Sequence, residues 1–204
     1  MADVEEYRAE DFTVAADKLL HAIKFRRSTR FFEDKKIEQE KLENIVQAGR
    51  YSATGSNSQG CSFYIVQEDV PTLRSMVWAG IENAPEGDTD MAKMMIAAIK
   101  SFIELKNEKG VDFLFRNAPC VVYIASNSAL DAGLAAQNME MVAAAQGLGV
   151  LYNGFLQRST SLSSDALKWL GMSDKPICAC MLMGYPEKTY ERTAPRKKAD
   201  VTWR

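Results

Sequence analysis

The sequence is poor in the residues that metal sites and disulfide frameworks require. Its 204 residues include one histidine, His21, and four cysteines. The cysteines at positions 61, 120, 178 and 180 are too few and too unevenly spaced for a disulfide framework, so we expect reduced thiols. Cys178 and Cys180 would share one face of a strand, which allows a metal interpretation. With one imidazole in the chain, small core residues are the simpler interpretation, and we expect no metal.

Long apolar runs and an excess of positive charge are also lacking. No stretch approaches the roughly 20 apolar residues of a membrane helix. The first twelve residues are acidic, without the basic-then-apolar order of a secretory signal. A net charge of -2 and a pI of about 5.6 provide no overall field that attracts nucleic acid or an anionic membrane. We therefore expect a cytoplasmic protein with neither nucleic acid nor membrane as a partner.

The composition is that of an ordinary globular chain, with 47% hydrophobic and 25% charged residues. The length favours a single domain over residues 1–204. Within it we expect an N-terminal extension over residues 1–12 and a basic C-terminal tail from about residue 185 to 204. No internal repeat or low-complexity segment is visible.

Apolar periodicity predicts helices and short strands that do not alternate strictly, which indicates an α+β fold with helices around a small sheet. The continuously apolar segment 120–125 should be the central strand. Segment 130–146 is apolar almost all round, so we expect a buried helix there. The predicted helices are 13–25, 38–51, 70–81, 91–109, 130–146 and 162–170. The predicted strands are 62–67, 120–125, 150–152 and 177–183, and residues 53–57 form a loop.

The first motif with chemical content is Arg26-Arg27-Ser28-Thr29-Arg30, where a predicted helix becomes extended chain. In an extended segment, residues 26, 28 and 30 point to one side and present two guanidinium groups and a hydroxyl to one target. A phosphate dianion suits that arrangement, because guanidinium groups bind it bidentately. The alternative is a set of solvated charges that complement the C-terminal dipole of the helix.

Three further motifs are weaker when taken singly. The small residues and amides of segment 52–59 could address a polar heterocycle, or could form an ordinary loop. The glycines of segment 147–155 would allow the backbone to approach something flat, or could simply end a helix. The basic residues of segment 192–198 could bind an anion, or could be a solvated tail.

Taken together and in this order, the motifs resemble those of the nitroreductase family. The resemblance extends over nearly the whole chain except about 78–112. Its motifs are Arg26-Arg27-Ser28-Thr29-Arg30-Phe31-Phe32, then 48–59, Asn117-Ala118-Pro119, Ala135-Ala136-Gln137-Asn138, Gly147-Leu148-Gly149 and Gly184-Tyr185-Pro186.

The resemblance implies a mainly antiparallel sheet in an intertwined homodimer, with two FMN sites built from both chains. It assigns Arg26, Arg27, Ser28 and Arg30 to the FMN phosphate and ribityl group, and Ala53, Thr54, Gly55 and Asn57 to the loop that the partner subunit contributes. It also assigns Tyr152, Asn153 and Gly154 to the backbone beside the flavin ring, and Arg196 and Lys198 to a basic pair that returns to the phosphate.

The implied activity is an FMN-dependent oxidoreductase of ping-pong mechanism. NADH or NADPH would pass hydride to flavin N5, and the acceptor would be a nitroaromatic, a quinone or an enone. Because the flavin carries the electrons, no catalytic side chain is predicted. Two departures from the family pattern, Gly60-Cys61 in place of proline and tryptophan and Asn153 in place of an acidic residue, could alter ring tuning and substrate fit. Alternatives are a dehalogenating or flavin-cleaving relative with a lid from residues 78–112, or a non-catalytic FMN-binding sensor or store.

Overall fold

The structure is a computed structural model that describes residues 4–172 and 174–204. Its four strands form one antiparallel sheet in the order β1-β2-β4-β3, with Tyr64 opposite Tyr123 and Val150 opposite Met183. All six residues of β2 are buried, as the continuous apolar run predicted. The expected α+β class is therefore confirmed. The strands are β1 (Ser62–Val66), β2 (Cys120–Ala125), β3 (Gly149–Tyr152) and β4 (Ile177–Gly184).

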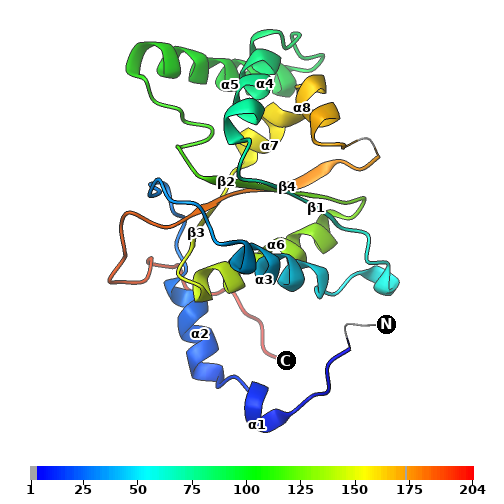
Figure 1. The fold of residues 1–204 in the computed structure, drawn as a ribbon, viewed down its shortest axis with the longest axis vertical. Helices are drawn as coiled ribbons and strands as arrows, with labels where there is room; N and C mark the ends of the chain where they lie inside the picture. The colour runs from blue at the N-terminus through cyan, green and yellow to red at the C-terminus, as the bar shows by residue number, and fades with distance from the viewer. Residues whose placement is uncertain (1–3, 173) are drawn as a thin grey trace.

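Helices cover both faces of the sheet (Figure 1). Successive β2 side chains alternate between two cores, Val121 and Tyr123 in one, Val122 and Ile124 in the other. This alternation makes three layers, with β2 buried on both sides. On one face lie α4 (Val70–Glu82), α5 (Asp90–Lys109), α7 (Gly154–Ser161) and α8 (Ser164–Trp169), and on the other α3 (Gln39–Arg50) and α6 (Ala129–Ala145).

Helices α3 and α6 pack closely at Gly49 of α3. A Cβ added to Gly49 would lie 2.8 Å from Met139 Sδ of α6 and from Phe63 Cε1, so a larger residue would displace these side chains. The prediction that this helix is buried all round was wrong for the single chain, because Leu130 is 71% and Leu134 is 42% exposed. An apolar pattern on every face of a helix predicts burial, but it does not show whether the same chain or another chain covers each face. The outer face of α6 therefore exposes apolar side chains within one chain, together with Gln137 and Asn138.

Three short elements were not predicted, namely α1 (Ala9–Phe12), α7 and the single 3₁₀ turn η1 (Gly55–Asn57) within the expected loop. The helix predicted from residue 13 begins later, as α2 (Ala16–Phe25), and none of its residues is buried. Figure 1 shows α1 and α2 beyond the α3 and α6 layer, away from the sheet. The apolar residues of α2 that predicted a packed helix, Leu19, Leu20 and Ile23, are each about half exposed.

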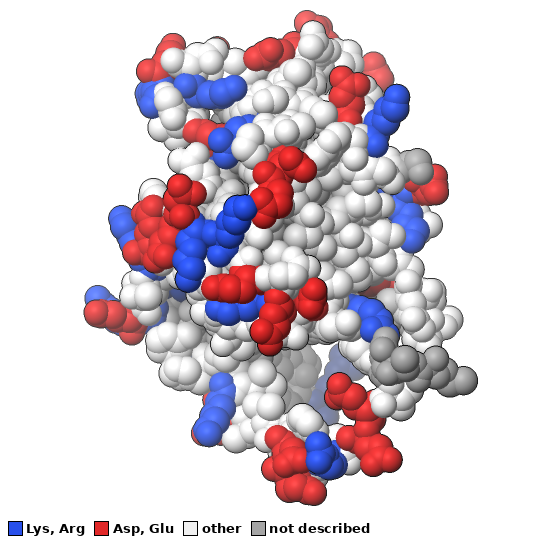
Figure 2. Space-filling model, in the orientation of Figure 1, with Lys and Arg blue, Asp and Glu red and all other residues white. Residues whose placement is uncertain are grey.

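The charged surface has no extended region of one sign on the face drawn in Figure 2, where acidic and basic side chains are intermixed. Among the helices of the described residues, none is long and apolar enough to cross a bilayer.

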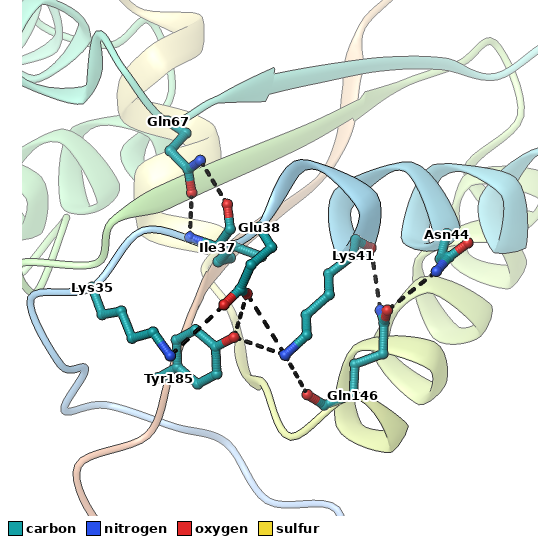
Figure 3. Close-up of polar contacts among 8 residues, drawn as sticks. All are labelled: Lys35, Ile37, Glu38, Lys41, Asn44, Gln67, Gln146 and Tyr185. Atoms are coloured by element: carbon teal, nitrogen blue, oxygen red, sulfur yellow. Dashed lines mark hydrogen bonds and ion pairs between the residues drawn. The ribbon is translucent and has the colours of Figure 1, made fainter.

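A polar cluster fixes the start of α3 against the end of the sheet (Figure 3). The Tyr185 hydroxyl donates to the Glu38 carboxylate and accepts from Lys41 Nζ at 2.7 Å. Lys41 Nζ also donates to the Gln146 carbonyl oxygen at 3.3 Å, at the end of α6. Tyr185, Lys41 and nearby charges lower the pKa of Glu38 to about 2. The cluster therefore joins α3, α6 and the chain that leaves β4.

Candidate functional site

The arginine segment runs beside β3. Ser28 and Val150 form a parallel bridge, and the Thr29 N–H donates to the Val150 carbonyl oxygen at 3.0 Å. The approach is close enough that a Cβ on Gly149 would lie 2.2 Å from Thr29 Oγ1, so this position must lack a side chain. The structure thus brings the first and third sequence motifs together at one edge of the sheet.

The same segment is anchored by the chain that follows β4. Phe32 and Pro186 form an antiparallel bridge, and the Glu33 N–H donates to the Tyr185 carbonyl oxygen at 2.9 Å. The arginine segment therefore continues into a stretch held between α3 and the C-terminal part of the chain. Contacts within the chain hold its backbone on both sides.

Arg26 is held by an internal ion pair. Its Nη1 lies 2.8 Å from Oε1 of Glu140, a residue of α6 that is 1% exposed. Among the described residues, Oε2 of Glu140 has no hydrogen-bond partner. Burial raises the pKa of the Glu140 carboxyl in spite of Arg26, and burial together with Glu140 raises the pKa of the Tyr152 hydroxyl. Arg26, Glu140 and Tyr152 thus form one electrostatic unit that reaches β3.

Arg27 faces the C-terminal tail. Its guanidinium lies 4.2 Å from the ring centroid of Tyr190 and donates to the Arg192 carbonyl oxygen at 3.1 Å. Arg27 and residues 189–193 and 195 line a pocket of about 540 Å³. Arg196 follows directly after this pocket, and Lys198 is exposed two residues further on. The tail therefore returns to the arginine segment at Arg27.

Arg30 lies in a second pocket, of about 280 Å³, between the arginine segment and the start of α7. Its Nη1 makes a 3.3 Å hydrogen bond to the Ser28 carbonyl oxygen. The structure therefore gives Arg26 and Arg30 different surroundings, the first bound to α6 and the second lining an open pocket. The pocket is lined by Arg30, Phe113, Arg116, Leu151, Tyr152, Asn153, Gly154, Phe155 and Arg158.

Asn153 is a structural residue of this pocket. Its Oδ1 accepts from the Leu156 N–H at 2.9 Å and caps α7, while its Nδ2 donates to the Leu114 carbonyl oxygen at 2.7 Å. Its own N–H is bonded to the Cys180 carbonyl oxygen. In the described part of the chain, the N–H groups of Gly154 and Phe155 have no protein acceptor. Direct donation to a ligand therefore falls to Gly154 and Phe155, at the positive end of α7.

The Ala53–Asn57 loop lies elsewhere. Figure 1 shows η1 at the far end of the α3 and α6 layer from β3 and the arginine segment. Thr54 Oγ1 accepts from the Gln59 N–H at 3.0 Å, which closes the loop. Ser56, Asn57 and Gln59 all have positive φ, a conformation that non-glycine residues keep where the surrounding structure enforces it. Within one chain, this loop does not meet the other predicted site residues.

Sequence reasoning missed five residues of the 280 Å³ pocket, namely Phe113, Arg116, Leu151, Phe155 and Arg158. Arg116 directly precedes the Asn117-Ala118-Pro119 motif. Arg158 lies one helical turn after Gly154, so a correctly predicted α7 would have placed it beside the pocket. Among the described residues, no group of three or more His, Cys, Asp or Glu side chains is arranged to hold a metal ion.

This fold and the arrangement of motifs at one sheet edge match a known class of protein. The family model described as the nitroreductase family matches residues 23–185. The chain therefore belongs to the nitroreductase family.

Individual relatives agree with this assignment. A nitroreductase with bound FMN from Bacteroides fragilis NCTC 9343 has a TM-score of 0.73 at 20% identity, over 91% of this chain and 98% of that one. A second, from Desulfitobacterium hafniense DCB-2, has a TM-score of 0.69 at 19% identity, over 91% and 98% of the two chains. The FMN reductase (NADPH) of Bacillus subtilis (strain 168) is 27% identical over 144 residues, 70% of this chain. That match spans 56% of the reductase.

Proposed function

We propose that the protein is a homodimeric FMN-dependent oxidoreductase. Reducing equivalents would come from NADH or NADPH and pass to a nitroaromatic, quinone or enone acceptor in a ping-pong cycle. The proposal rests on the arginine segment beside β3, because its Arg30 lines one pocket together with Gly154 and Phe155 at the start of α7. Membership of the nitroreductase family and the FMN bound in similar solved structures support it.

The groups present fit FMN. The phosphate and ribityl chain need cationic and hydroxyl donors, and Arg26, Arg27, Ser28 and Arg30 supply them within one short segment. The tail brings Arg196 to the neighbourhood of Arg27, and Lys198 follows it. The flavin ring needs a stretch of backbone along which it can lie. Tyr152, Asn153 and Gly154 offer such a stretch where β3 passes into α7.

When bound, FMN supplies the redox chemistry, accepting hydride at N5 from the nicotinamide and passing it to the acceptor. The chain's own contribution is orientation and electrostatics. In this proposal the Gly154 N–H, at the positive end of α7, would lie beside the ring of a bound flavin and would favour its reduced form. Arg30 lines the same pocket and adds positive charge to it.

A homodimer accounts for the position of the Ala53–Asn57 loop. We propose that Ala53, Thr54, Gly55 and Asn57 of a second copy complete each flavin site. Two observations support a second copy, because the outer face of α6 and the whole of α2 expose apolar side chains. Leu130 and Leu134 on α6 and Leu19 and Ile23 on α2 would be covered by it.

Flavin content is the first test. The purified protein should be yellow, and denaturing extraction should release FMN. Apo-protein titrated with FMN should bind it less tightly in Arg30→Ala, by about tenfold or more, because a charge-assisted contact is lost. Arg30→Lys should recover part of the affinity, since it keeps the charge without the planar fork.

Lys168→Gln provides a matched control, because this exposed residue of α8 carries the same charge and does not line the pocket. Its FMN affinity should equal that of the wild type. A colourless protein that takes up no FMN contradicts the proposal. Bound flavin that neither NADH nor NADPH reduces would instead favour a binding protein.

A further inference from the structure

The 280 Å³ pocket holds more positive charge than the arginine segment provides. Arg116 and Arg158 line it together with Arg30, and none of its lining residues is acidic. The three guanidinium groups come from three separate parts of the fold, namely the arginine segment, the turn before β2, and α7. Arg30 and Arg158 are exposed and Arg116 is half-buried, so water weakens their mutual repulsion, and a bound anion would lower it further.

The nearest carboxylate does not neutralise this charge, because it is already engaged. Asp112 Oδ2 lies 3.1 Å from Arg74 Nε, and Asp112 Oδ1 accepts from the N–H groups of Leu114 and Phe115. Burial and the neighbouring Arg30 lower the pKa of Arg116 in spite of Asp112. A guanidinium nevertheless stays protonated at neutral pH.

The backbone holds Arg116 in this position. Arg116 has φ 51° and Asn117 has φ 54°, two successive non-glycine residues in the left-handed region. That conformation is unfavourable for both residues and is kept only where the surroundings enforce it. It places the Arg116 guanidinium 4.1 Å from the ring centroid of Phe113. The Arg116 guanidinium therefore lies over the Phe113 ring, which lines the pocket.

Two aromatic rings line the pocket, and Phe155 is the one left open to an occupant, because Phe102 and the Arg116 guanidinium cover Phe113. Phe113 and Phe155 both line it, and both pack on Phe102, Phe113 stacked at 5.0 Å and Phe155 edge-on at 5.1 Å between ring centroids. This shared support fixes the two rings. Arg158 is anchored at the floor, where its Nη1 makes a 3.4 Å hydrogen bond to the Gly154 carbonyl oxygen.

We propose that Arg116 and Arg158 select nitroaromatic acceptors that carry a carboxylate. The nitro group of such an acceptor takes up two electrons and two protons and becomes a nitroso group with release of water, while the carboxylate is unchanged. The ring would lie against Phe155, which is 41% exposed, and the carboxylate would pair with the two guanidinium groups. This inference rests on the proposed function, because the pocket adjoins the Gly154 N–H assigned there to the flavin. A phosphate of the nicotinamide donor is the other anion that could meet these arginines, and the test separates the two.

The test compares a charged ligand with a neutral one of the same shape. Benzoate and benzamide are titrated calorimetrically into the protein as purified, for wild type, Arg116→Gln, Arg158→Gln and the control Lys168→Gln. We expect wild type and Lys168→Gln to bind benzoate at least about tenfold more tightly than benzamide. Each pocket variant should lose most of that preference while its affinity for benzamide changes little.

The corresponding kinetic measurement uses 4-nitrobenzoate and 4-nitrobenzamide as acceptors for dithionite-reduced protein. The preference in kcat/KM should follow the preference in binding. Reduction rates with NADH and NADPH are measured in parallel, and they should change equally, if at all, in the pocket variants. A loss confined to NADPH would overturn the proposal in favour of the donor phosphate.

Failure of the two proposals can be told apart. Equal binding of benzoate and benzamide by the wild type, or a preference that survives both substitutions, overturns the carboxylate site whatever the activity. A preference that depends on the arginines, in a protein whose flavin is absent or is not reduced, supports the anion site and overturns the proposed oxidoreductase.

Discussion

The Arg26 guanidinium and the Glu140 carboxylate form a 2.8 Å ion pair between residues 114 positions apart in the chain. This pair joins the arginine segment to α6 on the side of the sheet that carries α3. Because Glu140 is almost fully buried and Arg26 is mostly covered, the two charges depend on each other. The pair therefore fixes how the arginine segment lies at the proposed flavin site.

Breaking this pair from one side should be costly. Glu140→Gln leaves a largely buried guanidinium without its counter-charge, and we expect it to lower the free energy of unfolding by about 3 kcal/mol. In a double-mutant cycle with Arg26→Gln, the coupling energy should be about 1–3 kcal/mol. Urea denaturation of the four proteins measures it. Additive effects of the two substitutions would show that the pair contributes nothing of its own.

The contact between Gly149 and Thr29 gives a second prediction about the same segment. In Gly149→Ala, the new Cβ would overlap the Thr29 side chain, at a cost of about 1–3 kcal/mol in stability. Affinity for FMN should fall as well, because Thr29 lies within the arginine segment. Thr29→Ala removes two of the three atoms that the new methyl would meet, so the double variant should regain part of both losses. The absence of any rescue would mean that the clash lies elsewhere.

The strands and the motifs at the sheet edge could be predicted from the sequence, because each is marked by a short, local pattern of residues. Six consecutive apolar or small residues predict β2. Gly147 and Gly149 mark the end of α6 and the start of β3. Helix α7 was missed because glycine, serine and threonine dominate it. Its start is capped by Asn153, a local signal that the sequence carries, whereas the burial of Leu156 depends on the tertiary fold.

The pocket arginines were missed for a related reason. Arg116 and Arg158 do not belong to the same sequence motif. They line one pocket because β2, β3 and α7 bring their segments together. The arginine segment itself was predicted correctly as a unit that is extended and polar. The prediction that its side chains face one target did not include the ion pair between Arg26 and Glu140. No local pattern in the sequence indicated that Glu140 is buried on α6.

The cluster around Tyr185 predicts a pH dependence of stability. The pKa of Glu38 in the folded protein is about 2, against an ordinary value of 4.5. A depressed carboxyl pKa contributes stability that is fully present above the unfolded value and is lost as pH falls toward the folded value. Glu38→Gln should therefore lower the urea midpoint at pH 6, and the difference from wild type should shrink between pH 4.5 and about 2.

Glu40→Gln is the matched control, since Glu40 is an exposed residue in the first turn of α3. Its effect should be small and should vary less with pH. If Glu38→Gln and Glu40→Gln behave alike across this range, the contact between Glu38 and Tyr185 does not stabilise the fold.

Mixing two defective variants tests whether each flavin site is built from two chains. In the proposed dimer, Arg30 of one copy and the Ala53–Asn57 loop of the other serve the same flavin. Arg30→Ala and Asn57→Ala should each bind FMN weakly as homodimers. When the two are unfolded together and refolded, half of the dimers are hybrids, and each hybrid combines an intact arginine segment with an intact loop at one site. About one site in four should then bind FMN with wild-type affinity.

Fluorescence titration of the mixture should show this tight fraction, and each variant refolded alone should lack it. If Arg30 and Asn57 serve a flavin within one chain, every site keeps one defect and no tight fraction forms, which would remove the shared site from the proposal.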